Sequence, residues 1–191
     1  MWYDAQHLPA GETVLNTPDF FEKLAAYLAA HQLPYLRRDD RRDSADQADL
    51  TLAWRAPMLF GLSSVTHDYA FYDLDRLTTP VTDRGAYLRD LHARHRQAIN
   101  ARFPTPRPFR LHIPDIVTIA VAAEFDRACR DLALTPAYSM LGGEAHLLIL
   151  LALRSATVTT RGISPRYEMH PVQARAFVEQ IARELLTPIA R

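Results

Sequence analysis

The arginine-rich segment at residues 84–110 constrains this chain more than any other feature. It holds seven arginines and one acidic residue, Asp90, whereas the 191-residue chain as a whole has a formal net charge of zero. The segment therefore carries a charge of +6 and the rest of the chain −6. A concentrated positive surface attracts anions over roughly 8–10 Å at physiological salt. The sequence thus predicts one anion-binding region in an otherwise acidic molecule.

Most of this segment has the pattern of an amphipathic helix. Helical spacing over residues 83–102, with Thr82 as the cap, places one histidine among four apolar residues on a single stripe: Leu88, Leu91, His95, Ala98 and Ile99. The arginines Arg89, Arg94 and Arg96 fall outside the stripe. The proline-rich residues 103–108 then end the helix and predict a connector inside the domain.

Length and composition predict one globular domain over residues 1–191, because the chain is long enough for a full core and 48% of its residues are hydrophobic. Arginine outnumbers lysine 21 to 1, a ratio that GC-rich bacterial codon usage explains, so arginine number alone does not indicate nucleic-acid binding. The single cysteine, Cys129, excludes an intramolecular disulfide and fits a reducing cytoplasm. We expect no signal peptide and no membrane span, and hence a cytoplasmic protein.

Helix-like and strand-like patterns both occur along the chain. The expected elements are a helix at 17–31 capped by Thr17, strands at 50–55, 58–66 and 69–74, the helix at 83–102, a strand at 109–113 ended by Pro114, a helix at 115–132, a strand at 145–153 paired with 156–160, and a helix at 171–188. The β-branched residues 116–121 leave a buried strand as the alternative to the first part of the helix at 115–132. The predicted fold is α+β, with a mainly antiparallel sheet of five to six strands covered by three to four amphipathic helices.

Local catalytic motifs are missing from the sequence. Six glycines form neither GxGxxG nor a P-loop, and the chain has no GxSxG, no HExxH and no Cys/His pair at zinc spacing. These absences lower the weight of an enzymatic function, and no cofactor is predicted.

Two histidines on the arginine-rich helix are metal-ligand candidates. His92 and His95 are three residues apart, so their side chains are neighbours and would share a metal or a phosphate. The competing interpretation is that His95, between Leu91 and Ile99 on the apolar stripe, is a buried and hydrogen-bonded core residue. Burial would lower its pKa and leave it neutral at pH 7.

A second candidate group combines carboxylates and imidazoles from two expected strands. Glu144 and His146 flank one residue and so project to the same side of a strand, while His112 and Asp115 belong to another strand that would lie beside it. Together they would hold a divalent metal that activates water. The alternative is that Glu144 is a turn residue and His146 is a polar group at the sheet edge.

Acidic residues at 66–75 form a third candidate, because Asp73 and Asp75 would share a strand face near His67 and Asp68. Metal nucleases use paired acids in this way. Their usual Glu-x-Lys partner is missing, since the only lysine is Lys23 on the first expected helix. Solvent-facing acids at a strand end are the alternative.

The leading functional prediction is a cytoplasmic, bacterial-type interaction module. It binds an acidic protein or another anionic partner through five arginines of the helix and linker: Arg89, Arg94, Arg96, Arg102 and Arg107. The alternative is a metal-dependent hydrolase or nuclease acting on a phosphate-containing substrate. A homo-oligomer held by these arginines is a third interpretation. Nucleic acid ranks below protein as a ligand because the sequence pI is about 7.1.

Overall fold

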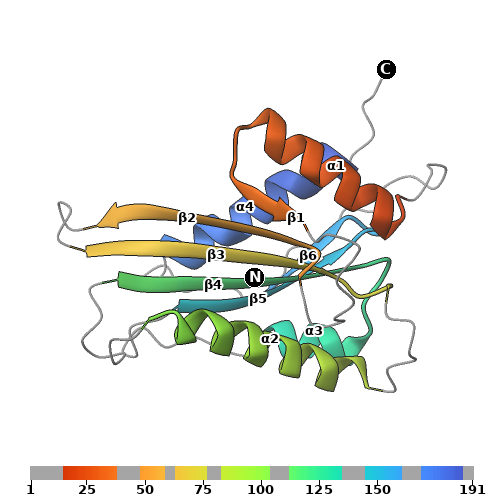
Figure 1. Ribbon diagram of the computed structural model, residues 1–191. Coiled ribbons are helices and arrows are strands. Elements are labelled where there is room, and N and C mark those ends of the chain that lie inside the picture. Colours follow the sequence, from red (N-terminus) through yellow and green to blue (C-terminus); the bar gives the residue numbers. More distant parts are fainter. Residues whose placement is uncertain are drawn as a thin grey trace.

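A mixed β-sheet with helices on both faces forms the body of the molecule (Figure 1). The computed structural model describes residues 15–37, 48–58, 63–76, 83–103, 112–134, 145–160 and 169–186. Within these ranges the elements are, in order, α1 (Thr17–Ala30), β1 (Tyr35–Arg37), β2 (Leu50–Met58), β3 (Ser63–Asp73), α2 (Arg84–Ala101), β4 (His112–Ala122), α3 (Arg127–Leu134), β5 (Ala145–Ala152), β6 (Thr157–Thr159) and α4 (Met169–Leu186).

The strands lie in the sheet in the order in which they occur in the chain, β1 to β6. β1, β2 and β3 pair antiparallel, as do β5 and β6, whereas β3–β4 and β4–β5 are parallel. A parallel pair needs a crossover, and α2 and α3 supply the two crossovers on one face of the sheet. α1 and α4 cover the other face (Figure 1). The predicted α+β class is therefore confirmed, but the sheet is mixed rather than mainly antiparallel.

The prediction of a helix at 115–132 is wrong over its first half. β4 runs through Pro114 to Ala122, and α3 begins only at Arg127. The side chains of Val117, Ile119 and Val121 pack on the α1/α4 side, and those of Ala120 and Ala122 on the α2/α3 side. A strand buried on both faces is rich in β-branched residues and shows no polar alternation, which explains the error.

Two prolines lie inside strands. Pro114 pairs with Thr66 of β3, and within the described residues the ladder to β5 begins at Asp115. Pro57 pairs with Ser64, beyond the three residues of β2 that meet β1. Proline is tolerated in strands at edge-like positions. The prediction that Pro114 ends its strand is therefore wrong.

Several other boundaries differ from the predictions by small amounts. The expected strands at 58–66 and 69–74 belong largely to one strand, β3. The helix caps are Asn16 for α1 and Asp83 for α2, whose side chains accept hydrogen bonds from backbone N–H groups of the first turn. The predicted pairing of 145–153 with 156–160 is confirmed as the β5–β6 hairpin.

Two apolar cores hold the helices against the sheet. The larger one lies between the sheet and α1/α4 and includes Phe20, Leu24, Leu28, Phe71, Ile149 and Ile181. The second lies under α2 and α3 and includes Leu88, Leu91, Phe125, Cys129 and Leu150. Each fully buried side chain of this size stabilises the fold by about 1.5–3 kcal/mol. None of the described helices is long and apolar enough to cross a membrane.

Candidate functional site

The outer side of α2 carries the predicted arginines. The helix packs on the sheet through buried Leu88, Leu91, His95 and Ile99, so the predicted stripe is confirmed except for Ala98, which is exposed. The arginines lie outside this stripe: Arg89 and Arg102 are exposed, and Arg94 and Arg96 are half-buried. These four residues are the basic face of α2. Arg107 lies outside the described residues.

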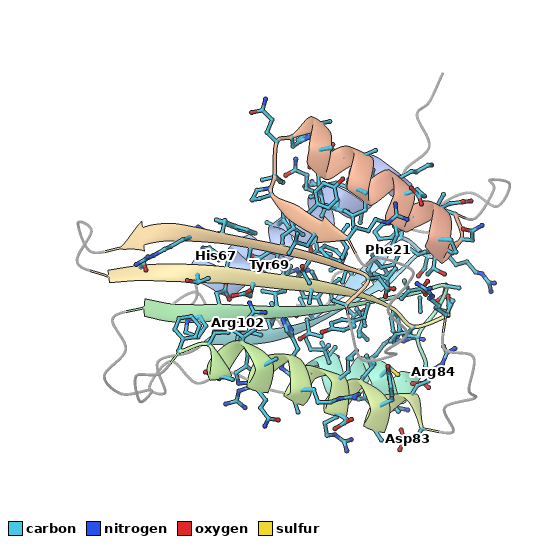
Figure 2. The ribbon with its side chains drawn as sticks, in the orientation of Figure 1. Phe21, His67, Tyr69, Asp83, Arg84 and Arg102 are labelled. Atoms are coloured by element: carbon cyan, nitrogen blue, oxygen red, sulfur yellow. The ribbon has the colours of Figure 1, made fainter. Side chains whose placement is uncertain are left out.

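Acidic residues of the same molecule already contact part of this region. Arg94 Nη2 lies 3.1 Å from Asp90 Oδ2, and Arg102 Nη1 lies 3.4 Å from Asp68 Oδ1. Burial raises the pKa of Asp68, and the Arg102 guanidinium opposes that rise. At the other end of α2, Arg84 Nη2 is 3.8 Å from Asp75 Oδ1. Figure 2 shows Arg84 and Arg102 at opposite ends of the helix.

Arg89 and Arg96 share one flank of α2. They are seven residues apart, which amounts to nearly two full turns and roughly 10.5 Å along the helix axis. Arg94, with its partner Asp90, lies on the opposite flank of the helix by the same geometry. Arg89 and Arg96 therefore form one row of positive charge on one flank of α2, and the Arg94–Asp90 ion pair lies on the other flank.

A chain of hydrogen bonds lies beneath the basic face and joins α2 to the sheet. His92 Nδ1 and His95 Nδ1 are 2.7 and 2.9 Å from the hydroxyl oxygen of Thr118 on β4. His92 Nε2 is 3.2 Å from His146 Nδ1 on β5. We call these four residues the imidazole chain. A hydroxyl donates one hydrogen bond and accepts others, so Thr118 satisfies both ring nitrogens.

The histidines of α2 are neutral at pH 7. Burial, and then the nearby His146, His95 and Arg96 side chains, lowers the pKa of His92 to about 3. Burial and the Arg102 guanidinium lower the pKa of His95 to about 4. The geometry matches the core interpretation of His95. Both ring nitrogens of His92 and Nδ1 of His95 contact protein groups. No group of three or more His, Cys, Asp or Glu among the described residues is arranged to hold a metal ion.

A second buried polar pair lies on the opposite face of the sheet. His67 Nδ1 is 2.8 Å from Asp115 Oδ2, with side chains only 5% and 2% exposed. Trp54 stacks on the His67 ring at 4.8 Å, and Tyr69 contacts the Trp54 ring edge-on. Figure 2 labels His67 and Tyr69 on β3. Burial and the Asp115 carboxylate raise the pKa of Tyr69. The pair is thus enclosed by aromatic rings on the α4 side.

The sheet separates the residues of the predicted metal-hydrolase group. Asp115 bonds to His67 on the α1/α4 side, whereas His146 bonds to His92 on the α2 side. Glu144 and the side chain of His112 lie outside the described residues. The third predicted group is likewise divided, because His67 contacts Asp115 and Asp68 contacts Arg102 on the other face.

Sequence reasoning missed three of the buried polar contacts. Thr118 lies in an apolar run, and its role depends on α2 packing above it. The His67–Asp115 pair depends on the register of β3 against β4. One signal in the sequence could have indicated such contacts, namely a polar residue inside an otherwise apolar strand. Because buried polar groups in proteins are hydrogen-bonded, such a residue predicts a hydrogen-bond partner nearby.

Three comparisons with known proteins found no match: no family model, no curated protein and no solved structure matches the chain.

Proposed function

We propose that this protein is a cytoplasmic interaction module that binds an acidic protein through the basic face of α2, Arg89, Arg94, Arg96 and Arg102. One observation carries the proposal. The arginines project from a helix whose opposite side is fixed to the sheet by buried apolar residues and by the imidazole chain. Cations on a rigid support lose little backbone freedom when they bind a partner, which favours association.

The charge balance favours an acidic protein over nucleic acid. Two of the four arginines in the basic face, Arg94 and Arg102, contact acids of their own molecule. Salt-dependent nucleic-acid binders commonly neutralise about 6–10 phosphates. A carboxylate-bearing protein surface needs fewer contacts, and the planar guanidinium suits bidentate contact with carboxylate.

The positions of the candidate metal ligands favour the interaction module over the metal-dependent hydrolase. Its reaction needs ligands that converge on one ion. Asp115 and His146 bond to partners on opposite faces of the sheet. The geometry therefore supports the interaction module better.

Fluorescence anisotropy with a labelled glutamate-rich peptide tests the proposal. The double variant Arg89→Gln/Arg96→Gln should weaken peptide binding by about tenfold or more, because each lost charge-assisted contact contributes about 0.7 kcal/mol or more. The matched control is Arg127→Gln/Arg175→Gln, which removes two arginines from α3 and α4. The control should bind as the native chain does.

Two results would contradict the proposal. One is an equal loss of affinity in both double variants, which would indicate a non-specific effect of total charge. The other is native binding that does not weaken between about 50 and 500 mM salt, because contacts between exposed charges are screened in that range. A DNA oligonucleotide of equal charge that binds tighter than the peptide would replace the proposed partner with nucleic acid.

A further inference from the structure

A cavity of about 470 Å³ lies between α1 and the carboxyl end of β3, and no arginine of the basic face lines it. Its lining includes Phe21 and Glu22 of α1, Arg37 of β1, and Asp73 at the carboxyl end of β3. Sites for small molecules commonly have volumes of about 300–1,000 Å³. The volume of this cavity therefore falls within the range of small-molecule sites.

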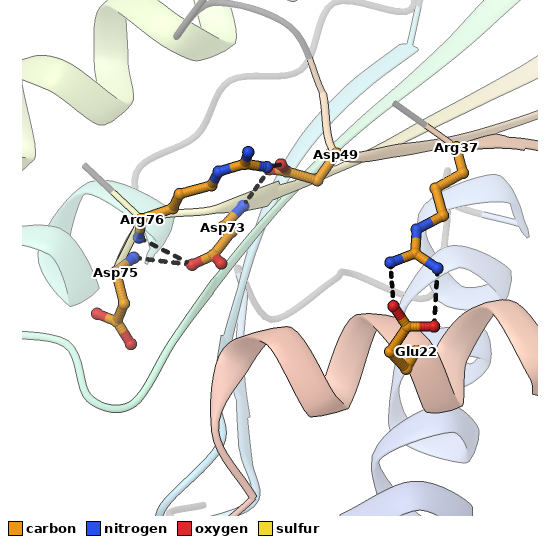
Figure 3. A network of polar contacts seen from close by, with 6 residues as sticks. All are labelled: Glu22, Arg37, Asp49, Asp73, Asp75 and Arg76. Carbon is orange, nitrogen blue, oxygen red and sulfur yellow. Dashed lines mark hydrogen bonds and ion pairs between the residues drawn. The ribbon is translucent and has the colours of Figure 1, made fainter. Parts of the chain in front are cut away.

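Most charges in the cavity wall are already paired. Arg37 makes a two-fold hydrogen bond with Glu22, one of its contacts being 2.8 Å. Arg76 Nη1 lies 3.4 Å from Asp49 Oδ1, and Asp49 Oδ2 accepts a hydrogen bond from the Asp73 N–H at 2.7 Å. Figure 3 shows the two networks. Each arginine of the lining thus has a carboxylate partner, which leaves Asp73 and Asp75 as the excess charge of the wall.

Both carboxylate oxygens of Asp75 already have contacts within the protein. Its Oδ2 accepts a hydrogen bond from the Ala123 N–H at 2.6 Å, and its Oδ1 lies 3.8 Å from Arg84. Asp73 differs because one oxygen only is engaged: Oδ1 accepts from the N–H groups of Asp75 and Arg76 at 2.9 and 3.2 Å. Among the described residues, Oδ2 of Asp73 has no hydrogen-bond partner.

Asp73 is a half-buried carboxylate beside two other acids. Burial raises the pKa of Asp73, the hydrogen bonds from the backbone N–H groups of Asp75 and Arg76 oppose that rise, and the nearby carboxylates of Asp49 and Asp75 add to it. A donor that carries a positive charge would satisfy Oδ2 and offset both the burial and the repulsion.

We propose that this cavity binds a small organic cation whose ammonium or guanidinium group donates to Oδ2 of Asp73. A hydrogen-bonding cation fits better than a metal ion, because no group of three or more acids, histidines or cysteines in the described ranges is arranged as a metal site. The side chains of Phe21 and Pro18 supply apolar wall for a carbon chain. The cation is either a free molecule or an arginine or lysine side chain of a partner protein.

Isothermal titration of the full chain tests this inference. The probes are agmatine and putrescine, with 1,4-butanediol as an uncharged match for putrescine. We expect the two cations to bind and the diol not to bind. Asp73→Asn keeps the Oδ1 acceptor for the two N–H groups, so it should fold, and it should weaken cation binding by about tenfold or more. The matched control Asp131→Asn removes an exposed carboxylate of α3 and should leave binding unchanged.

If the Asp73→Asn variant fails to fold, the pH dependence of cation binding by the unaltered chain tests the inference instead. Cation affinity should fall as the pH is lowered through the raised pKa of Asp73, because only the carboxylate form accepts the cation's hydrogen bond without competition from its own proton. A capped Gly-Arg-Gly peptide that binds tighter than agmatine would identify a partner's side chain as the source, and the reverse order a free cation.

Three results would overturn the inference: no heat of binding for either cation up to about 10 mM, equal binding by the Asp73→Asn variant, or equal binding of the diol. None of these results bears on the basic face of α2, because the Arg89→Gln/Arg96→Gln variant leaves the cavity wall intact. Failure here is therefore distinguishable from failure of the proposed function.

Discussion

The two sides of α2 place basic residues in opposite electrostatic environments. On the buried side, His92 and His95 are held by Thr118 and kept neutral, with pKa values of about 3 and 4. On the exposed side, Arg89 and Arg102 remain in contact with water and retain their charge. A histidine that is buried without a carboxylate partner loses its proton, whereas a guanidinium does not and so stays outside.

This contrast assigns different roles to the two sides. The buried side contributes to the stability of the fold through hydrogen bonds, and the exposed side contributes to binding through charge. Changes to the imidazole chain should therefore alter the free energy of unfolding, and changes to the basic face should alter affinity for anions.

Acid should produce the largest change in stability. In the unfolded chain His92 and His95 have a pKa near 6.5, well above their folded values, so below that pH the unfolded state binds protons that the folded state does not. Stability is thus fully present above pH 6.5 and is lost as the pH falls. Each histidine should lower the free energy of unfolding by about 2 kcal/mol at pH 5.

Urea unfolding between about pH 7 and 5 measures this effect. Asp68 and Asp73, whose pKa values are raised, act in the opposite sense, because the folded state holds their protons more tightly than the unfolded state does. A free energy of unfolding that stays constant from pH 7 to 5 would show that the buried side of α2 does not hold neutral histidines.

Removal of the central hydroxyl should have the next largest effect. Thr118→Val leaves the Nδ1 atoms of two imidazoles without their shared partner, and it should destabilise the fold by about 2 kcal/mol. Thr118→Ser keeps the hydroxyl and serves as the control. Equal stability of the valine and serine variants in urea would mean that the imidazole chain contributes nothing to the fold.

Loss of an exposed ion pair should have the smallest effect on stability. Asp90 is 66% exposed in its contact with Arg94, so Asp90→Asn should change the free energy of unfolding by less than about 0.5 kcal/mol. The same variant removes a negative charge from the basic face and should increase affinity for an acidic peptide by about twofold. A large loss of stability, or a weaker affinity, would remove the distinction between the two sides.

The sequence predicted the helices better than the sheet. The stripe of α2 and the positions of α1 and α4 follow from helical spacing, which is local. A helix was favoured over a strand at 116–121 because Val117, Val121 and Phe125 share one helical face, whereas β4 in fact runs to Ala122. Without β4 as a strand, α2 and α3 could not be recognised as crossovers, and the parallel pairs at the centre of the sheet were not predicted.

In the candidate site, too, features set by local spacing were predicted and features set by strand register were not. The arginines of α2 could be placed outside the stripe from spacing alone, and the structure puts them on the outer side. The relation of Asp115 to His146 depends on strand register, where a shift of one residue moves a side chain to the other face. Thr118 became a central residue only through contact with a helix that is 23 residues or more away in sequence.

The most direct test of the account follows the side-chain Nε–Hε signals of arginine by NMR during titration with a glutamate-rich peptide. We predict that the signals of Arg89 and Arg96 shift with the peptide concentration and saturate together, while those of Arg127 on α3 and Arg175 on α4 stay in place. Saturable shifts confined to Arg127 and Arg175, or no shift at any arginine of α2, would contradict the basic face as the binding surface.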